Sequence, residues 1–286
     1  MQIKRNLTIV SLLALALAVS AQHKKREDIN LWPETQVVQN VKELKTGVMH
    51  VFPADDSNNC HRAVILCPGG GYARHSLNNE GFDWVPFFRD MGYTTIVLRY
   101  RLPAGNPELP VADAEQAMRI VRARATEWGI DPHQVGIMGF SAGGHLASTL
   151  TVTRKADVRP DFSLLFYPVI TMDRSYTHMR SHNELMTEGA TAELERQYSS
   201  EQQVDNQTPP VFLALSNDDR TVLPKNAVMF YLAMMEHNRP ASLHIYPTGR
   251  HGWGFRDTFV YHEQMTTELK KWLETLPSSQ EQMKNK

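Results

Sequence analysis

Hydrophobic and polar positions form two kinds of segment after residue 45. Short apolar runs rich in β-branched and aromatic residues predict strands, and several are apolar at nearly every position, as expected where both faces of a sheet are covered. Longer segments with apolar residues every three or four positions predict amphipathic helices. The predicted strands are VMHVF (48–52), AVILC (63–67), TTIVLRY (94–100), VGIMGF (135–140), FSLLFYPV (162–169), VFLALS (211–216) and SLHIYP (242–247).

The helical patterns lie between and after these strands. They cover residues 112–129, 226–238 and 260–276, and Gly129 is the expected C-cap of the first. Alternation of strands and helices predicts an α/β fold with a mostly parallel central sheet and helices on both faces. We expect one such domain over residues 45–277.

One long polar stretch interrupts the alternation. Residues 171–209 contain a single helical pattern, near 190–198, and predict an insertion or lid over one end of the sheet. His178 and His182 would face one side of a helix and bind a metal there, but the surrounding residues indicate a loop. We expect neither a metal nor a cofactor. Residues 278–286 are predicted to form a flexible tail.

The N-terminal residues predict a signal peptide. MQIKR is positively charged, LTIVSLLALALAVS is an apolar run, and VSA at its end supplies the small residues that a signal peptidase accepts. The run is shorter than the roughly 20 residues of a membrane span. We expect cleavage after Ala21, with residues 22–44 as an extension, and an exported protein, periplasmic or secreted, without a stable membrane anchor. The alternative is an uncut N-terminal anchor.

Composition narrows the class of protein. The chain of 286 residues has 30 basic and 31 acidic side chains and a net charge of −1, so it lacks the basic excess typical of nucleic-acid binding. Cys60 and Cys67 bracket a predicted strand that would separate them by about 23 Å. This is too far for a disulfide. Nothing in the sequence indicates an oligomeric state.

The segment GFSAGGHLAS (139–148) carries the first candidate for chemistry. Ser141 lies at a predicted strand-to-helix turn, where a nucleophile would occupy a strained backbone position. Gly139 and Gly143 would make so sharp a turn possible, because larger residues at these two positions would clash. The following helix would direct its N-terminal N–H groups toward an oxyanion. The alternative is that Ser141 is an ordinary helix cap.

A nucleophilic serine needs a histidine base, and the base needs a carboxylate that fixes its tautomer. After such a strand-to-helix turn, the expected chain order is serine, acid, histidine. His251 lies in the glycine-rich loop TGRHGWGF after the last predicted strand, so we predict it to be the base. The other histidines of this region fall on predicted helices or a strand: His237, His244 and His262.

Two carboxylates follow the strand at 211–216. Asp218 and Asp219 are both candidates for the acid, and we favour Asp219. A turn-capping role is the alternative for either. The loop CPGGGY (67–72) follows the strand at 63–67 and supplies candidate oxyanion donors, the N–H groups of Gly70 and Gly71, with Ala142 as a third. A flexible turn is the alternative for this loop.

These motifs together resemble the α/β-hydrolase esterases, in particular the bacterial carbohydrate esterases of the acetyl-xylan type. The resemblance rests on PGGGYARHSLNNEGFDWVPFFRDMGYTTIVLRYRLP, GIDPHQVGIMGFSAGGHLAS, PPVFLALSNDDRTVLPKNAVMFYLAM and YPTGRHGWGF, and it covers about residues 45–275. It implies Ser141 as nucleophile, Asp219 as acid and His251 as base. Pro68 departs from the pattern, since many relatives have histidine there.

The resemblance implies an exported serine esterase that hydrolyses short acyl esters, mainly acetyl, of carbohydrates such as acetylated xylan or xylo-oligosaccharides. We expect Tyr72 and Trp253 to stack on a sugar ring, or else to pack against the loops that carry them. A serine exopeptidase of the same fold is one alternative, although such enzymes usually have a large N-terminal domain. A catalytically inactive binding protein is another, although those normally lack a triad residue.

Overall fold

The computed structural model describes residues 23–32, 46–187 and 189–278. At its centre is an eight-stranded sheet in the order β1-β2-β4-β3-β5-β6-β7-β8. β1 and β2 pair antiparallel with each other, β2 pairs antiparallel with β4, and every pair from β4 to β8 is parallel. The strands are β1 (Glu27–Asn30), β2 (Val48–Phe52), β3 (Ala63–Cys67), β4 (Thr94–Arg99), β5 (Val135–Phe140), β6 (Ser163–Phe166), β7 (Val211–Ser216) and β8 (Ala241–Tyr246).

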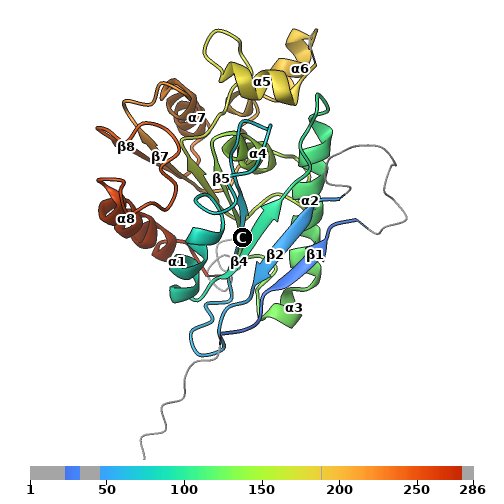
Figure 1. Cartoon of the computed structure of the whole chain (residues 1–286), viewed down its shortest axis with the longest axis vertical. Coiled ribbons are helices and arrows are strands. Elements are labelled where there is room, and N and C mark those ends of the chain that lie inside the picture. The colour runs from blue at the N-terminus through green and yellow to red at the C-terminus, as the bar shows by residue number, and fades with distance from the viewer. Residues whose placement is uncertain (1–22, 33–45, 188, 279–286) are drawn as a thin grey trace, which may run out of the picture.

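Helices cover both faces of this sheet (Figure 1). They are α1 (Val85–Asp90), α2 (Glu108–Ala123), α3 (Ala125–Trp128), α4 (Ala142–Thr151), α5 (Met179–Leu185), α6 (Ala192–Gln197), α7 (Lys225–Glu236) and α8 (His262–Glu274). The connection from β3 through α1 to β4 moves across the sheet in one direction, and the connections through α2, α4 and α7 move in the other. Because such crossovers are right-handed, α1 lies on the opposite face of the sheet from α2, α4 and α7. No helix in the described ranges combines the length and apolar character needed to cross a bilayer.

The predicted α/β fold with a mostly parallel sheet is confirmed. β3, β5 and β7 are buried at every position, which is why their sequences read as continuous apolar runs. Strand β6 ends at Phe166, earlier than the apolar run predicts, because Tyr167 adopts a positive φ of 35°.

Two elements differ from the sequence prediction at the N-terminal side of the chain. Part of the predicted extension forms β1, whose four residues alternate between half-buried and exposed at the sheet edge. The helical pattern at 112–129 forms two helices, because the helix breaks at Arg124, between α2 and α3. The first of them, α2, begins at Glu108, four residues earlier than the pattern predicts. Gly129, in the left-handed conformation at φ 66°, ends α3 as predicted. The predicted signal peptide lies outside the described residues.

The insertion at 171–209 contains more regular structure than its sequence indicates. α6 corresponds to the predicted helical pattern, but α5 occupies the segment that was expected to be a loop. The two helices lie at the top of the molecule in Figure 1, beyond the carboxyl ends of the parallel strands. The insertion therefore lies at the end of the sheet where residues that follow the strands come together.

The two cysteines are both free thiols, as predicted from their separation. Cys67 is buried at the end of β3, and Cys60 is half-buried in the turn before it. Burial raises the pKa of each thiol, so neither is activated as a thiolate.

Candidate active site

Ser141 lies at the tip of the turn between β5 and α4, in a strained conformation with φ 53° and ψ −119°. Backbone hydrogen bonds hold it there. Its N–H donates to the Phe166 carbonyl at 3.1 Å, and its own carbonyl accepts from the Val169 N–H at 3.0 Å. A non-glycine residue persists in such a conformation only where the surroundings fix it, and this is common at catalytic positions.

Glycines make this turn possible, as the sequence predicts. A Cβ at Gly139 would overlap the Gly143 carbonyl and lie 2.6 Å from the Ala147 Cβ. A Cβ at Gly143 would overlap the Cys67 carbonyl and lie 2.5 Å from the Pro68 oxygen. The start of α4 therefore packs directly on the loop that follows β3, and this places the serine beside that loop.

The structure brings Ser141, His251 and Asp219 together in one hydrogen-bonded chain. The His251 Nε2 lies 2.8 Å from the Ser141 Oγ, and its Nδ1 lies 2.6 Å from the Asp219 Oδ2. An ionised carboxylate only accepts, so Nδ1 carries the proton and Nε2 accepts from the serine hydroxyl. Asp219 is buried, and its Oδ1 accepts from the N–H groups of Thr221 at 2.8 Å and Val222 at 3.0 Å.

Asp218 has a different role from its neighbour. Its Oδ2 accepts from the Thr248 hydroxyl at 2.6 Å and its Oδ1 from the Arg250 N–H at 2.7 Å. These hydrogen bonds hold the pKa of Asp218 below its ordinary value, with the Thr248 hydroxyl as the largest cause. Asp218 thus fixes the loop that carries His251, and Asp219 is the carboxylate that contacts the imidazole.

The remaining histidines of this region lie elsewhere. His237 caps α7, His244 stacks on Phe212 within β8 at 4.5 Å, and His262 begins α8. None of the three lines the cavity that contains Ser141. This agrees with the choice of His251 as the candidate base.

The glycine loop after β3 lies beside the serine. Gly70 and Gly71, with φ of 133° and 66°, line the same cavity as Ser141 and His251. Their N–H groups and that of Ala142, the first residue of α4, make no hydrogen bond with any described residue. Unpaired backbone donors next to a nucleophile are what a developing oxyanion requires.

Sequence reasoning did not find Glu80, a buried carboxylate in the same cavity. Its Oε2 accepts from the Gly69 N–H at 2.9 Å, and its Oε1 accepts from the Tyr167 hydroxyl at 2.9 Å. That hydroxyl in turn accepts from the Gly254 N–H at 2.9 Å. Burial raises the pKa of Glu80. No motif surrounds Glu80 in the polar stretch SLNNE, so nothing in the sequence marks it.

The structure corrects the prediction that Tyr72 and Trp253 stack on a sugar. Tyr72 is 1% exposed and its hydroxyl donates to the His145 Nδ1 at 2.8 Å. Trp253 is 4% exposed, stacks on Phe259 at 4.2 Å and donates to the Ser216 hydroxyl. Neither ring presents a face to a ligand, so both residues support the loops that carry them.

His178 and His182 contact different partners. The Nδ1 of His178 lies 2.8 Å from the Ser181 hydroxyl, and the Nε2 of His182 lies 2.9 Å from Glu195. No group of three or more side chains suited to a metal ion occurs in the described part of the chain. His178 instead lines the cavity that contains Ser141.

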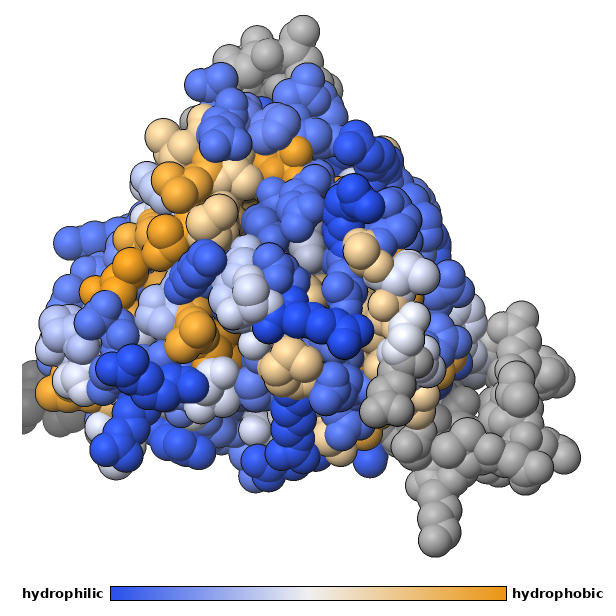
Figure 2. Space-filling model, turned by 90° about the horizontal axis from the view of Figure 1, so that it is seen from above, coloured by the Kyte–Doolittle hydropathy of each residue, from blue (hydrophilic) through white to orange (hydrophobic). Residues whose placement is uncertain are grey.

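That cavity is polar and has a volume of about 320 Å³. Glycine, hydroxyl, imidazole and guanidinium groups form most of its lining, and Figure 2, which views the molecule from above, shows a predominantly hydrophilic surface with apolar atoms toward one side. A cavity with this lining suits a small polar ligand more than a long acyl chain.

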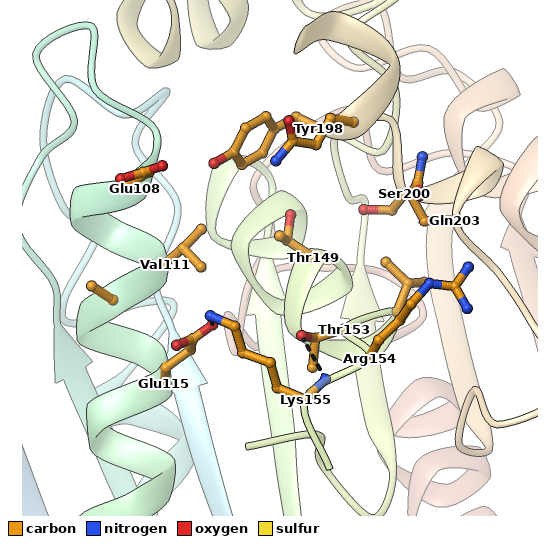
Figure 3. A pocket seen from close by; sticks show the side chains of 13 residues that line it. Glu108, Val111, Glu115, Thr149, Thr153, Arg154, Lys155, Tyr198, Ser200 and Gln203 are labelled. Carbon is orange, nitrogen blue, oxygen red and sulfur yellow. Dashed lines mark hydrogen bonds and ion pairs between the residues drawn. The ribbon is translucent and has the colours of Figure 1, made fainter. Parts of the chain in front are cut away.

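A second cavity, of about 500 Å³, lies between α2, α4 and the insertion. In Figure 3, Lys155 reaches across it toward Glu115, and their side chains pair at 2.6 Å. Tyr198 lies at its upper end in this view. None of the residues predicted from the motifs lines this cavity, so its greater volume does not make it the candidate active site.

The sequence of this chain is similar to those of several known proteins. The BD-FAE family model matches residues 49–234. The chain is 40% identical over 281 residues to an acetylxylan esterase of Xylanibacter ruminicola and 31% identical over 244 residues to an endo-1,4-beta-xylanase B of Butyrivibrio fibrisolvens. These matches cover 97% and 80% of this chain, but the chain spans only 56% and 38% of the two relatives.

A solved structure shows the same arrangement of elements. The acetyl ester-xyloside bifunctional hydrolase of Caldicellulosiruptor lactoaceticus superposes with a TM-score of 0.78 at 32% sequence identity. The match covers 87% of this chain and 96% of that one. The likeness therefore extends over nearly the whole described fold.

Proposed function

Since this chain belongs to the BD-FAE family of α/β-hydrolases, we propose that it is a serine esterase that removes short acyl groups, mainly acetyl, from carbohydrates such as acetylated xylan or xylo-oligosaccharides. The observation that carries the proposal is the continuous hydrogen-bonded chain from the Ser141 Oγ through His251 to Asp219. The names of the Xylanibacter and Caldicellulosiruptor proteins support acetyl and xyloside substrates.

In the first step, the Ser141 Oγ attacks the ester carbonyl carbon while the His251 Nε2 accepts the hydroxyl proton. The carbonyl oxygen becomes an oxyanion, which the N–H groups of Gly70, Gly71 and Ala142 would stabilise, each by about 3 kcal/mol. Asp219 stabilises the imidazolium and holds its orientation. The bond to the sugar oxygen then breaks as His251 returns its proton to the leaving alcohol.

In the second step, a water molecule attacks the acyl-enzyme. His251 accepts its proton, and the oxyanion forms again at the same donors. The ester bond to Ser141 then breaks as His251 returns the proton to the Ser141 Oγ, and the carboxylic acid is released. Every proton transfer uses the His251 Nε2, which the 2.6 Å contact with Asp219 keeps facing the serine. The proposal requires no group beyond the chain and water.

The test is release of acetate from acetylated xylo-oligosaccharides, with dipeptidyl chromogenic substrates assayed in parallel. We expect acetate release by the wild type and none by Ser141→Ala, and labelling by a fluorophosphonate at Ser141. Cleavage of dipeptidyl substrates without acetate release would indicate a peptidase instead. Absence of labelling would indicate an inactive binding protein.

We also propose that the enzyme is exported, on the support of the charged and apolar pattern of residues 1–21. Sequencing the N-terminus of the protein from its native host should give Gln22 as the first residue. A mature protein that retains Met1 would contradict this.

A further inference from the structure

Three arginines line the cavity that contains Ser141 and His251. They are Arg74, Arg180 and Arg256. Arg74 follows the glycine loop, Arg180 lies on α5 in the insertion, and Arg256 follows the loop of His251, so three distant segments bring positive charge to one place. All three side chains are solvent-exposed.

None of the three guanidinium groups takes part in an ion pair within the described residues, although eight other arginines do. The acidic side chain that lines the cavity is Glu80, which is buried and already accepts hydrogen bonds from Gly69 and Tyr167. Like charges that converge without ion-pair partners raise the local potential and attract an anion.

Two of the arginines lie beside the glycine loop, and the third lies beside the loop of His251. A Cβ on Gly71 would lie 3.5 Å from the Arg180 Cδ and 3.6 Å from its Nε. A Cβ on Gly70 would lie 3.1 Å from the Arg74 Cγ. Arg256 donates to the Gly252 carbonyl at 3.3 Å, directly after His251. An anion bound among these groups would therefore belong to the same molecule as the ester that Ser141 attacks.

We propose that the preferred substrate is an acylated oligosaccharide that carries a uronate, whose carboxylate is bound by these arginines. This inference rests on the proposed esterase function. A guanidinium binds a carboxylate through two parallel hydrogen bonds and needs no aromatic platform. Recognition through charge agrees with the burial of Tyr72 and Trp253, which leaves neither ring available for stacking on a sugar.

A binding experiment tests the inference without requiring catalysis. The probes are a deacetylated xylo-oligosaccharide with a glucuronate branch, the same compound with the carboxylate converted to a carboxamide, and a sulfated xylo-oligosaccharide of similar size. By calorimetry we expect the uronate to bind about tenfold more tightly than the carboxamide, as one good charge-assisted contact allows. Equal affinity for these two, or tighter binding of the sulfated compound, would overturn the proposal.

Variants assign the binding to the arginines. Arg74→Gln combined with Arg180→Gln should remove most of the uronate preference. Arg154→Gln is the matched control, because this arginine is 74% exposed and does not line the cavity. Preference retained by the double variant, or lost equally in the control, would contradict the assignment.

Kinetics separates this inference from the proposed function. At low salt, we expect kcat/KM for acetylated oligosaccharides that carry a uronate to exceed kcat/KM for neutral ones by about tenfold. At high salt the two values of kcat/KM should become similar, because salt screens the charges. Hydrolysis of both classes at equal rates would overturn the inference and leave the esterase standing. Selective binding of the uronate without hydrolysis of any ester would contradict the proposed esterase function but would still support an anion-binding site at the arginines.

Discussion

The Tyr167 hydroxyl donates a hydrogen bond to the Glu80 Oε1 and accepts one from the Gly254 N–H, both at 2.9 Å. Glu80 also accepts from the Gly69 N–H, so one buried network joins the loop of the oxyanion donors to the loop of His251. The Tyr167 ring lies edge-on to the His251 ring at 4.9 Å. These contacts fix two loops relative to each other, although neither Tyr167 nor Glu80 belongs to the hydrogen-bonded chain of Ser141, His251 and Asp219.

Removing the Tyr167 hydroxyl should therefore lower both stability and activity. Tyr167→Phe leaves buried hydrogen-bonding groups on Glu80 and Gly254 without a partner, which costs about 1–3 kcal/mol. We expect that loss in urea unfolding and a fall in kcat of about tenfold from misplacement of the loops. Tyr231→Phe is the control, because Tyr231 is half-buried and its hydroxyl has no hydrogen-bond partner among the described residues. Equal effects of the two substitutions would show that the network does not position the loops.

Substitution of Ser141 separates chemistry from backbone strain. Ser141→Ala should lower kcat by at least about 10⁴-fold, since among the described residues Ser141 is the hydroxyl that is hydrogen-bonded to His251. Ser141→Gly should be equally inactive but more stable than the alanine variant, by about 1 kcal/mol, because glycine tolerates φ 53° better. Thermal unfolding of the two variants measures the difference. A less stable glycine variant would show that the turn is not strained.

The two neighbouring aspartates should respond differently to the same substitution. Asp219→Asn removes the acceptor that fixes the His251 tautomer and should lower kcat by about 10⁴-fold. Asp218→Asn weakens the hydrogen bonds to Thr248 and Arg250 and should lower it by less than about tenfold. Initial rates with 4-nitrophenyl acetate compare them directly. A larger loss in Asp218→Asn would reverse the assignment of the acid.

Buried histidines should make the fold sensitive to acid. Burial lowers the pKa of His145 from 6.5 to about 4, and its Nε2 donates to the Tyr198 carbonyl at 2.7 Å. Between these pH values the unfolded chain binds the proton and the folded chain does not. The free energy of unfolding therefore decreases as pH falls from 6.5 to 4, by on the order of 3 kcal/mol from this residue.

Urea unfolding at several pH values measures this slope. His145→Gln should flatten it, while His133→Gln, at an exposed position, should leave it as it is in the wild type. His75, whose pKa burial also lowers to about 4, should account for a further part of the slope. An unchanged slope in His145→Gln would show that this imidazole is not held neutral.

The strands and the contact of Ser141, His251 and Asp219 were predictable for the same reason. Strands buried on both faces must be apolar throughout, and in a parallel sheet their carboxyl ends lie at one edge. Ser141 directly follows β5, and Asp219 and His251 lie in the loops after β7 and β8, so their meeting followed from chain order and strand direction. The residues at the end of each strand were therefore enough to predict which side chains would meet.

Contacts that depend on side-chain direction were not predictable in this way. Tyr72 and Trp253 lie next to site residues in the sequence, but their rings point into the core. Glu80 and the three arginines are ordinary polar residues until the fold brings them together. α5 was missed because its stretch MRSHNEL lacks a regular apolar face, and it is held by contacts such as that between His182 and Glu195.

The short strand β1 covers an edge of β2 that would otherwise be open. It pairs with β2 along its whole length, and its Glu27 and Asp28 place charges on the outermost edge. Glu27 is further tied to Arg124 at 2.9 Å. A truncated protein beginning at residue 46 would leave the backbone of β2 open for pairing with another molecule. Such a truncation should self-associate in light scattering even though its catalytic residues are all present.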